Sequence, residues 1–282
     1  MINDDEQVGR ILSRREVIKL LGAAGLVVLV GCGPDQATPE AVTSATQATS
    51  TTAPPATSTA LPAANAPSPT AALAEATTAS TTTAPSCIVR PALTEGPYFV
   101  DEQINRSDIR SDPSNGSVSE GAPLYLTFNV SQITANSCAA FAGAIVDIWH
   151  CDAWGVYSDA SDPGFNTIGQ KFLRGYQVTN NNGQAQFLTI YPGWYDGRAV
   201  HIHFKIRTSL DDAGYEFTSQ LFFDDAYTDI VYEQEPYAST GQRTRLNSQD
   251  GIFQQSGGQL TLAVTQTSEG YAATFDIGLD MT

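Results

Sequence analysis

Short segments in which apolar and polar residues alternate recur along the chain after residue 120. Such alternation is typical of β-strands with one face toward a core, because successive side chains point to opposite faces of a strand. The segments are rich in Val, Ile, Phe and Thr, and turn-forming residues separate them. They cover residues 123–133, 143–151, 171–179, 183–192, 199–208, 218–225, 259–267 and 271–279.

These segments predict an all-β domain built as a β-sandwich, since no window of this region has a sustained helical period. Short helical turns are expected within 224–234, where Pro236 then ends the pattern. The stretch after Cys87 contains Gly-Pro and no periodicity, and it predicts an extended arm.

The N-terminal region has a different pattern, which predicts export. Arg14 and Arg15 precede a short apolar run, 22–31, that ends in small residues. This arrangement is typical of a twin-arginine signal, and the run is too short to span a bilayer. The stretch "LVGC" resembles a lipobox, which predicts cleavage before Cys32 and acylation of its sulfur. A plain cleaved signal is the alternative.

Residues 33–86 are almost entirely Ala, Thr, Pro and Ser, and they predict a disordered tether that cannot bury a core. The predicted organisation is therefore a signal with lipobox over 1–32, a tether over 33–86 and a β-sandwich domain over 87–282. It predicts an exported protein on the extracytoplasmic side, periplasmic or at the cell surface. The N-terminal lipid is the only membrane contact expected.

The formal net charge of −16 argues against nucleic acid as a partner and against adhesion to anionic lipids. With Cys32 acylated, an odd number of cysteines remains, which predicts one disulfide and one free thiol. Cys138 and Cys151 flank a single predicted strand, so Cys87 is expected in the bridge. Its partner is left open.

Two of the chain's three histidines lie in the segment "RAVHIHFKI". His201 and His203 are two residues apart in a strand pattern, so both imidazoles should project from one face. This spacing favours a metal site, and a pair of hydrogen-bonded structural histidines is the alternative.

Two tyrosines follow turns that should bring them near these histidines. Tyr195 comes after Pro-Gly in "TIYPGWYDGR", and Tyr157 ends the loop "CDAWGVY". Because phenol has a pKa near 10, a pair of tyrosinates with two imidazoles favours ferric iron over zinc. Packing tyrosines on the rim of the domain are the alternative.

Four stretches resemble the intradiol ring-cleavage dioxygenases, the family of catechol 1,2-dioxygenase and protocatechuate 3,4-dioxygenase. They are "EGPYF", "DIWHCDAWGVYSD", "FLRGYQVTNNNGQAQFLTIYPGWY" and "RAVHIHFKI". The resemblance implies a β-sandwich of the intradiol dioxygenase type with a non-haem ferric ion, Fe(III). The implied ligands are Tyr157, Tyr195, His201 and His203.

The resemblance further implies that a catechol-type substrate is opened by O2 between its two hydroxyl-bearing carbons, giving a cis,cis-muconate-type product. Arg198 matches the arginine that lies against the bound catecholate, and Tyr195 matches the tyrosinate that is released to take up a proton. Gln220 matches an active-site glutamine, and Tyr98 in the arm is expected to contact substrate.

Other residues have structural interpretations. His150, Trp149 and Trp154 are expected in the strand, the core or the pocket wall, and the pair 224–225 is expected in a solvated turn rather than a calcium site. Arg198 could alternatively pair with Asp196 or another acid.

A second function class is a membrane-tethered β-sandwich module that binds aromatic or polymeric ligands without turnover. The complete ligand set with Arg198 favours the enzyme, because a binding module needs neither two tyrosinates nor a neighbouring cation. The sequence leaves open which catechol is used and whether the chain acts alone or as a homo-oligomer.

Overall fold

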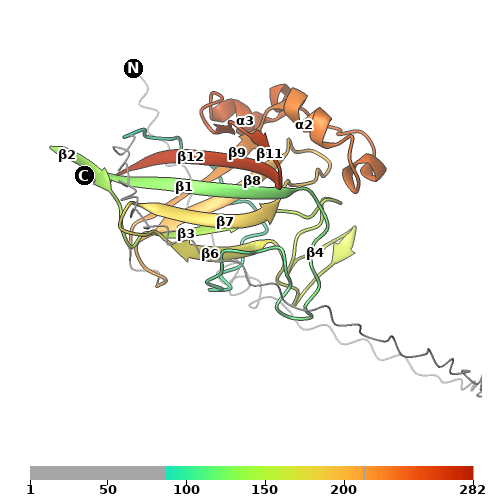
Figure 1. Ribbon diagram of the computed structural model, residues 1–282, viewed down its shortest axis with the longest axis horizontal. Coiled ribbons are helices and arrows are strands. Elements are labelled where there is room, and N and C mark those ends of the chain that lie inside the picture. The colour runs from blue at the N-terminus through green and yellow to red at the C-terminus, as the bar shows by residue number, and fades with distance from the viewer. Residues whose placement is uncertain (1–86, 212–213, 282) are drawn as a thin grey trace, which may run out of the picture. The chain divides into compact units, whose positions relative to one another are not determined.

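Two five-stranded sheets pack face to face in this computed structural model, which describes residues 87–211 and 214–281 (Figure 1). The all-β sandwich predicted from the sequence is confirmed. The predicted export signal, the acylated Cys32 and the tether lie outside the described residues. Within that described part, no helix is long and apolar enough to span a membrane.

The first sheet is organised around β1 (Pro123–Thr134). One edge of β1 pairs in parallel with β12 (Gly270–Asp280), which also pairs with β11 (Thr265–Thr267). The other edge pairs antiparallel with β7 (Gln184–Ile190) and then with β2 (Ser137–Ala140). The strand near the start of the described chain and the one near its end therefore lie side by side at the centre of this sheet.

The second sheet has the order β10-β9-β8-β3-β6. Its middle strand is β8, which pairs antiparallel with both β9 and β3. The bounds are β10 (Thr261–Leu262), β9 (Glu216–Phe223), β8 (His201–Arg207), β3 (Ile145–Trp149) and β6 (Arg174–Val178).

One predicted strand is wrong, because residues 259–267 form two short strands, β10 and β11, that pair in different sheets.

The predicted helical turn is confirmed as α2, whose first turn is capped by the Asp224 side chain accepting from Tyr227 N at 2.9 Å. The expected solvated turn at 224–225 is thus a helix start. The remaining elements are β4 (Ser161–Asp162), β5 (Phe165–Asn166), α2 (Asp225–Val231), α3 (Gly251–Gln255) and the 3-10 helices Tyr237–Thr240 and Asn247–Gln249.

The core lies between the two sheets, where alternate side chains of each strand interdigitate. Phe128 of β1 lies 5.4 Å from Phe204 of β8, measured between ring centroids. Ile202 and Ile206 of β8 face the same core. The intervening residues of β8 are polar and point to the opposite face, yet every residue of β8 is buried. Something must therefore cover the outer face of this strand.

The N-terminal arm provides this cover. It contains one isolated bridge, at Val89, but no helix or strand over residues 87–104, in keeping with the predicted extended arm. It starts along β12, where Gly278 N donates to Ile88 O at 2.7 Å, and it continues along β9, where Leu93 N donates to Thr218 O at 3.0 Å. The chain then crosses the outer face of β8.

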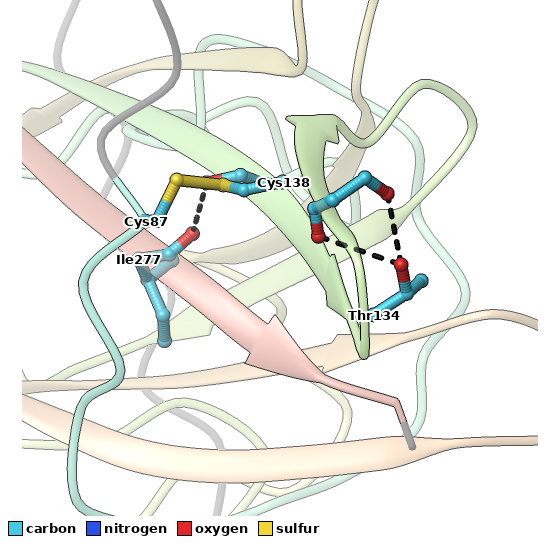
Figure 2. Close-up of a disulfide and its surroundings, with 6 residues drawn as sticks. Cys87, Thr134, Cys138 and Ile277 are labelled. Carbon is cyan, nitrogen blue, oxygen red and sulfur yellow. Dashed lines mark hydrogen bonds between the residues drawn. A yellow bond between two sulfur atoms is a disulfide. The ribbon is translucent and has the colours of Figure 1, made fainter.

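A disulfide fastens the beginning of the arm, as Figure 2 shows. Cys87, the cysteine expected in the bridge, pairs with Cys138 of β2, and their Cα atoms are 6.0 Å apart. Cys151 is a buried free thiol whose Sγ lies 3.5 Å from Gly193 O. The bridge therefore connects the arm to the edge of the first sheet.

Reduction of this disulfide should destabilise the domain without unfolding it under native conditions. The bridge closes a loop with a sequence separation of 51, for which chain entropy predicts a loss of about 4 kcal/mol in the free energy of unfolding. Urea unfolding with and without reductant measures this loss. A Cys87→Ser, Cys138→Ser variant should match the reduced protein and be insensitive to reductant; equal stability of all forms would contradict the prediction.

Candidate metal centre

Two tyrosine and two histidine side chains meet at the beginning of β8. The Oη atoms of Tyr157 and Tyr195 each lie 3.3 Å from His201 Nε2. His203 Nε2 lies 3.0 Å from the same nitrogen. The structure thus brings together all four residues singled out in the sequence, and their potential donor atoms converge on one point.

The hydrogen bonds of His201 fix which of its nitrogens carries a lone pair. Its Nδ1 lies 2.7 Å from Ala199 O, and a carbonyl can only accept, so Nδ1 carries the proton. The lone pair of Nε2 therefore faces the other three potential metal ligands, which are the two phenol oxygens and His203 Nε2. A backbone partner of this kind is usual behind a metal-binding imidazole.

His203 has a different environment. Its ring stacks on Trp149, with centroids 5.1 Å apart, and its buried Nδ1 has no hydrogen-bond partner among the described residues. Burial lowers the pKa of His201 to about 3 and lowers that of His203 well below its ordinary value. Both imidazoles are therefore neutral at neutral pH, which is the state that binds a metal.

The two phenols are protonated at neutral pH unless a strong cation is present. Burial raises the pKa of Tyr157, which is 1% exposed, well above its ordinary value. Burial also raises the pKa of Tyr195 to about 12, even though the Arg198 charge opposes this shift. Only a strongly Lewis-acidic ion would hold both as phenolates, so this donor set fits ferric iron better than zinc.

No group of three or more His, Cys, Asp and Glu side chains that could hold a metal ion occurs over 87–211 and 214–281. The candidate centre contains only two such side chains, His201 and His203, because its other two donors are phenols. The combined tyrosine and histidine set is therefore the candidate metal centre.

The two loops that carry the tyrosines contact each other directly. Gly155, two residues before Tyr157, has φ +82°, and a Cβ at this position would lie 2.3 Å from Trp194 O. A side chain there would push the loop after β3 away from the loop between β7 and β8. Gly193 N also donates to Asp152 O at 3.0 Å. Close backbone contact thus sets the distance between the tyrosines.

Arg198 is held beside the centre by a buried carboxylate. Its Nε donates to Asp250 Oδ2 at 2.9 Å, and its Nη1 lies 3.4 Å from His201 Nε2. Of the alternative pairings, the one with Asp196 is wrong, since Asp196 accepts from Thr244, whereas pairing with another acid is confirmed by Asp250. A fixed positive charge therefore lies next to the converging donor atoms.

Gln220 connects Arg198 to the arm. The side chain is fully buried, its Oε1 accepts from Arg198 Nη2 at 2.6 Å, and its Nε2 donates to Thr94 O at 2.8 Å. Gln220 also lies opposite His203 in the pairing of β8 with β9. It therefore positions the guanidinium and the arm relative to each other.

Asp250 is a residue of the site that sequence reasoning missed. Its Oδ2 also accepts from Ala199 N at 2.8 Å, and its Oδ1 caps α3 by accepting from Ile252 N at 2.7 Å. An aspartate before a short helix can be found from sequence as an N-cap. Its pairing with Arg198, 52 residues away, has no local signal.

The arm forms one wall of the centre. Gly96 lies against His203, and a Cβ on Gly96 would lie 2.9 Å from His203 Cε1. The Tyr98 ring stacks on the Tyr157 ring with centroids 4.3 Å apart and planes inclined by 20°. The arm therefore covers one histidine and one tyrosine of the candidate centre.

Ion pairs hold this wall in place along the outer face of β8. Lys205 Nζ lies 2.7 Å from Glu95 Oε2, and Arg207 Nη2 lies 2.8 Å from Asp101 Oδ1. Arg207 Nε also lies 3.0 Å from Asp147 Oδ2, in β3. The polar residues that follow the histidines in β8 thus bind the acidic residues of the arm.

The two neighbouring tryptophans differ in environment. Trp149 is buried and forms part of the wall behind His203, as expected. The sequence predicts Trp154 in the core or in a pocket wall, and the core position is wrong, because the side chain is 50% exposed. It lines an open surface groove with Glu120 and Pro236.

His150 is buried directly after β3 and stays outside the candidate centre. Its Nδ1 donates to Cys151 O at 2.8 Å, and its Nε2 accepts from Thr189 Oγ1 at 2.6 Å. Burial lowers the pKa of His150 to about 4. The neutral imidazole is therefore a structural group, in agreement with the sequence interpretation.

Acidification should destabilise the fold through His150. The unfolded imidazole takes up a proton below pH 6.5, whereas the folded one stays neutral until about pH 4, so stability is lost as pH falls between these values. The loss is about 1.4 kcal/mol per pH unit. The free energy of unfolding, measured with urea at pH 7, 6 and 5, should fall less steeply with decreasing pH in His150→Gln than in the wild type. Equal slopes for both proteins would contradict the assignment.

Comparison with known proteins gives consistent matches. A family model described as "Dioxygenase" matches residues 94–280. A curated chlorocatechol 1,2-dioxygenase from Pseudomonas putida is 26% identical over 153 residues, which are 48% of this chain and 53% of that protein. The alignment thus spans about half the length of this relative.

Among solved structures, an intradiol ring-cleavage dioxygenase from Tetranychus urticae is 31% identical with a TM-score of 0.60, covering 69% of this chain and 95% of that one. The dioxygenase domain of a dioxygenase carbohydrate-binding protein fusion from Streptomyces sp. SirexAA-E is 26% identical, with a TM-score of 0.48 and coverages of 69% and 100%.

Proposed function

The chain belongs to the intradiol ring-cleavage dioxygenase family, and from this premise we propose that it uses a ferric ion to open a catechol-type ring with O2. The ring opens between the two hydroxyl-bearing carbons and gives a cis,cis-muconate-type product. The observation that carries this proposal is that two phenol oxygens and the His203 Nε2 atom all lie 3.0–3.3 Å from His201 Nε2.

Tyr157, Tyr195, His201 and His203 would hold the ion. When bound, the ferric ion supplies the Lewis acidity that keeps phenols and the catechol hydroxyls deprotonated and makes the ring reactive toward O2. The lone pair of His201 Nε2 supports this assignment, because it faces both phenol oxygens and the Nε2 atom of His203.

The two tyrosines have different roles. Tyr157 is buried under Tyr98, whereas Tyr195 is half-buried and lies beside Arg198. Tyr195 Oη is therefore the phenol oxygen that takes up a proton from a substrate hydroxyl when the catechol binds. Tyr157 remains in place because the surrounding aromatic side chains leave it no room to move.

Arg198 stabilises negative charge on the substrate. Asp250 and Gln220 fix its guanidinium, so it needs no reorganisation as charge develops. The aromatic wall of Tyr98, Phe99 and Trp149 limits the water that reaches the same place. Both effects strengthen the electrostatic contribution of the arginine.

The site of action is proposed to be extracytoplasmic, with Cys32 acylated and the domain tethered to a membrane. The twin-arginine motif and the lipobox support this location. The disulfide between Cys87 and Cys138 also supports it, because such bonds persist in oxidising compartments.

Iron-loaded protein should be coloured by phenolate-to-iron charge transfer and should consume O2 with catechol. Tyr157→Phe or His203→Ala should reduce turnover by about 100-fold or more, and Tyr157→Phe should also weaken the visible band. Tyr191→Phe is the matched control, because it removes another buried phenol, one that hydrogen-bonds Thr228, without touching the centre. Visible spectra, iron content and oxygen uptake give the result.

Two outcomes would reject this function. A colourless protein with full iron occupancy would exclude tyrosinate ligands. Colour without oxygen uptake on any catechol would favour the alternative, a membrane-tethered module that binds aromatic or polymeric ligands without turnover.

Arg198→Met should retain iron and lower kcat by about 100-fold, because one fixed charge at the substrate is removed. Asp250→Asn should lower kcat by about tenfold, since the guanidinium keeps its charge but loses its ion pair. Arg110→Met removes a surface arginine paired with Asp108 and serves as the control. Wild-type kcat in Arg198→Met with full iron would contradict the role of Arg198.

A further inference from the structure

The side chains around the candidate metal centre differ in exposure. Tyr157, His201 and His203 are each at most 2% exposed, whereas Tyr98 and Tyr195 are half-buried. The Tyr98 ring lies edge-on to the Tyr195 ring with centroids 6.4 Å apart. These two rings therefore form a more exposed rim of the centre.

A carboxylate lies next to one of these rings. The Tyr98 hydroxyl donates to Asp162 Oδ2 at 2.7 Å. Because Tyr98 stacks on Tyr157, the Asp162 carboxylate is one hydrogen bond away from a ring that borders both proposed tyrosine ligands. The hydrogen bond fixes the position of the charge at the rim.

β4 and β5 form a short hairpin (Figure 1), and Asp162 is the last residue of β4. Asp162 pairs with Phe165, whose ring lies 6.3 Å from that of Tyr98. The hairpin is also tied to the proposed ligand loop, since Thr167 Oγ1 donates to Tyr157 O at 2.6 Å. The carboxylate therefore keeps a defined place relative to the centre.

The charge of Asp162 is not neutralised by the protein. The side chain is exposed, and no ion pair among the described residues includes it. The nearby cations are otherwise engaged: Arg198 pairs with Asp250, and the buried Arg174 donates to the carbonyls of Ser158 and Tyr98. The rim is thus negative on a chain with a net charge of −16.

We propose that Asp162, held by Tyr98, selects substrates by charge: it disfavours catechols with an anionic ring substituent and favours those with a cationic one. This inference rests on the proposed function for the position of the catechol. An ammonium group on a short side chain can pair with the exposed carboxylate, whereas a ring carboxylate is repelled by it. Because the site is open to solvent, each effect is about threefold to fivefold in affinity.

The test compares an anionic, a neutral and a cationic substrate: 3,4-dihydroxybenzoate, catechol and 4-(2-aminoethyl)catechol. Dissociation constants are measured by anaerobic titration of the iron-loaded protein, and kcat/KM by oxygen uptake. In Asp162→Asn, the preference for the cationic over the anionic compound should fall by about tenfold, the product of the two opposite effects. Tyr98→Phe keeps the stacked ring but releases the carboxylate, and should shift the preference in the same direction.

Asp211→Asn is the matched control, because it removes the same charge from the turn between β8 and β9, at the opposite end of β8 from His201. It should leave the preference unchanged. An equal preference in wild type and Asp162→Asn would overturn the role of Asp162 even if all three compounds are cleaved. Absence of oxygen uptake would instead reject the proposed function, while the anaerobic titrations would still decide the role of Asp162.

Discussion

The outer face of β8 is polar, and it must still be buried. Polar side chains removed from water destabilise a fold unless they find partners, and charged ones do so most strongly. The arm supplies these partners through Glu95 and Asp101, and it brings Gly96 against a histidine ring. The side chains concerned are His201, His203, Lys205 and Arg207. The contacts that cover the strand therefore also enclose the candidate centre.

Burial also sets the electrostatic character of the centre. It keeps the imidazoles neutral and raises the pKa of both phenols, so the protein alone offers four uncharged groups in a space of low polarity. A strongly Lewis-acidic ion is needed to hold both phenols as phenolates in such a place, which favours a trivalent ion over a divalent one. Arg198, held by Asp250, adds a positive charge beside the four donor atoms.

Local patterns predicted much of this structure, and contacts distant in sequence account for what they missed. Alternation over 199–208 is enough to predict β8 and the common face of His201 and His203, because both depend on a period of two. The partner of Cys87 and the pairing of Arg198 with Asp250 depend instead on how strands are ordered in space. The split of 259–267 has the same origin, since its two halves join different sheets.

The proposed metal binding and the proposed substrate selection use different parts of this fold. The proposed ligands come from a central strand and from two loops in close backbone contact, so most changes there also disturb packing. The rim comes from the arm and a two-stranded hairpin, where Asp162 is exposed and its side chain hydrogen-bonds Tyr98. A change of charge at that position alters what approaches the ion but leaves the four donor atoms in place. Selectivity can therefore vary in this architecture without loss of the metal centre.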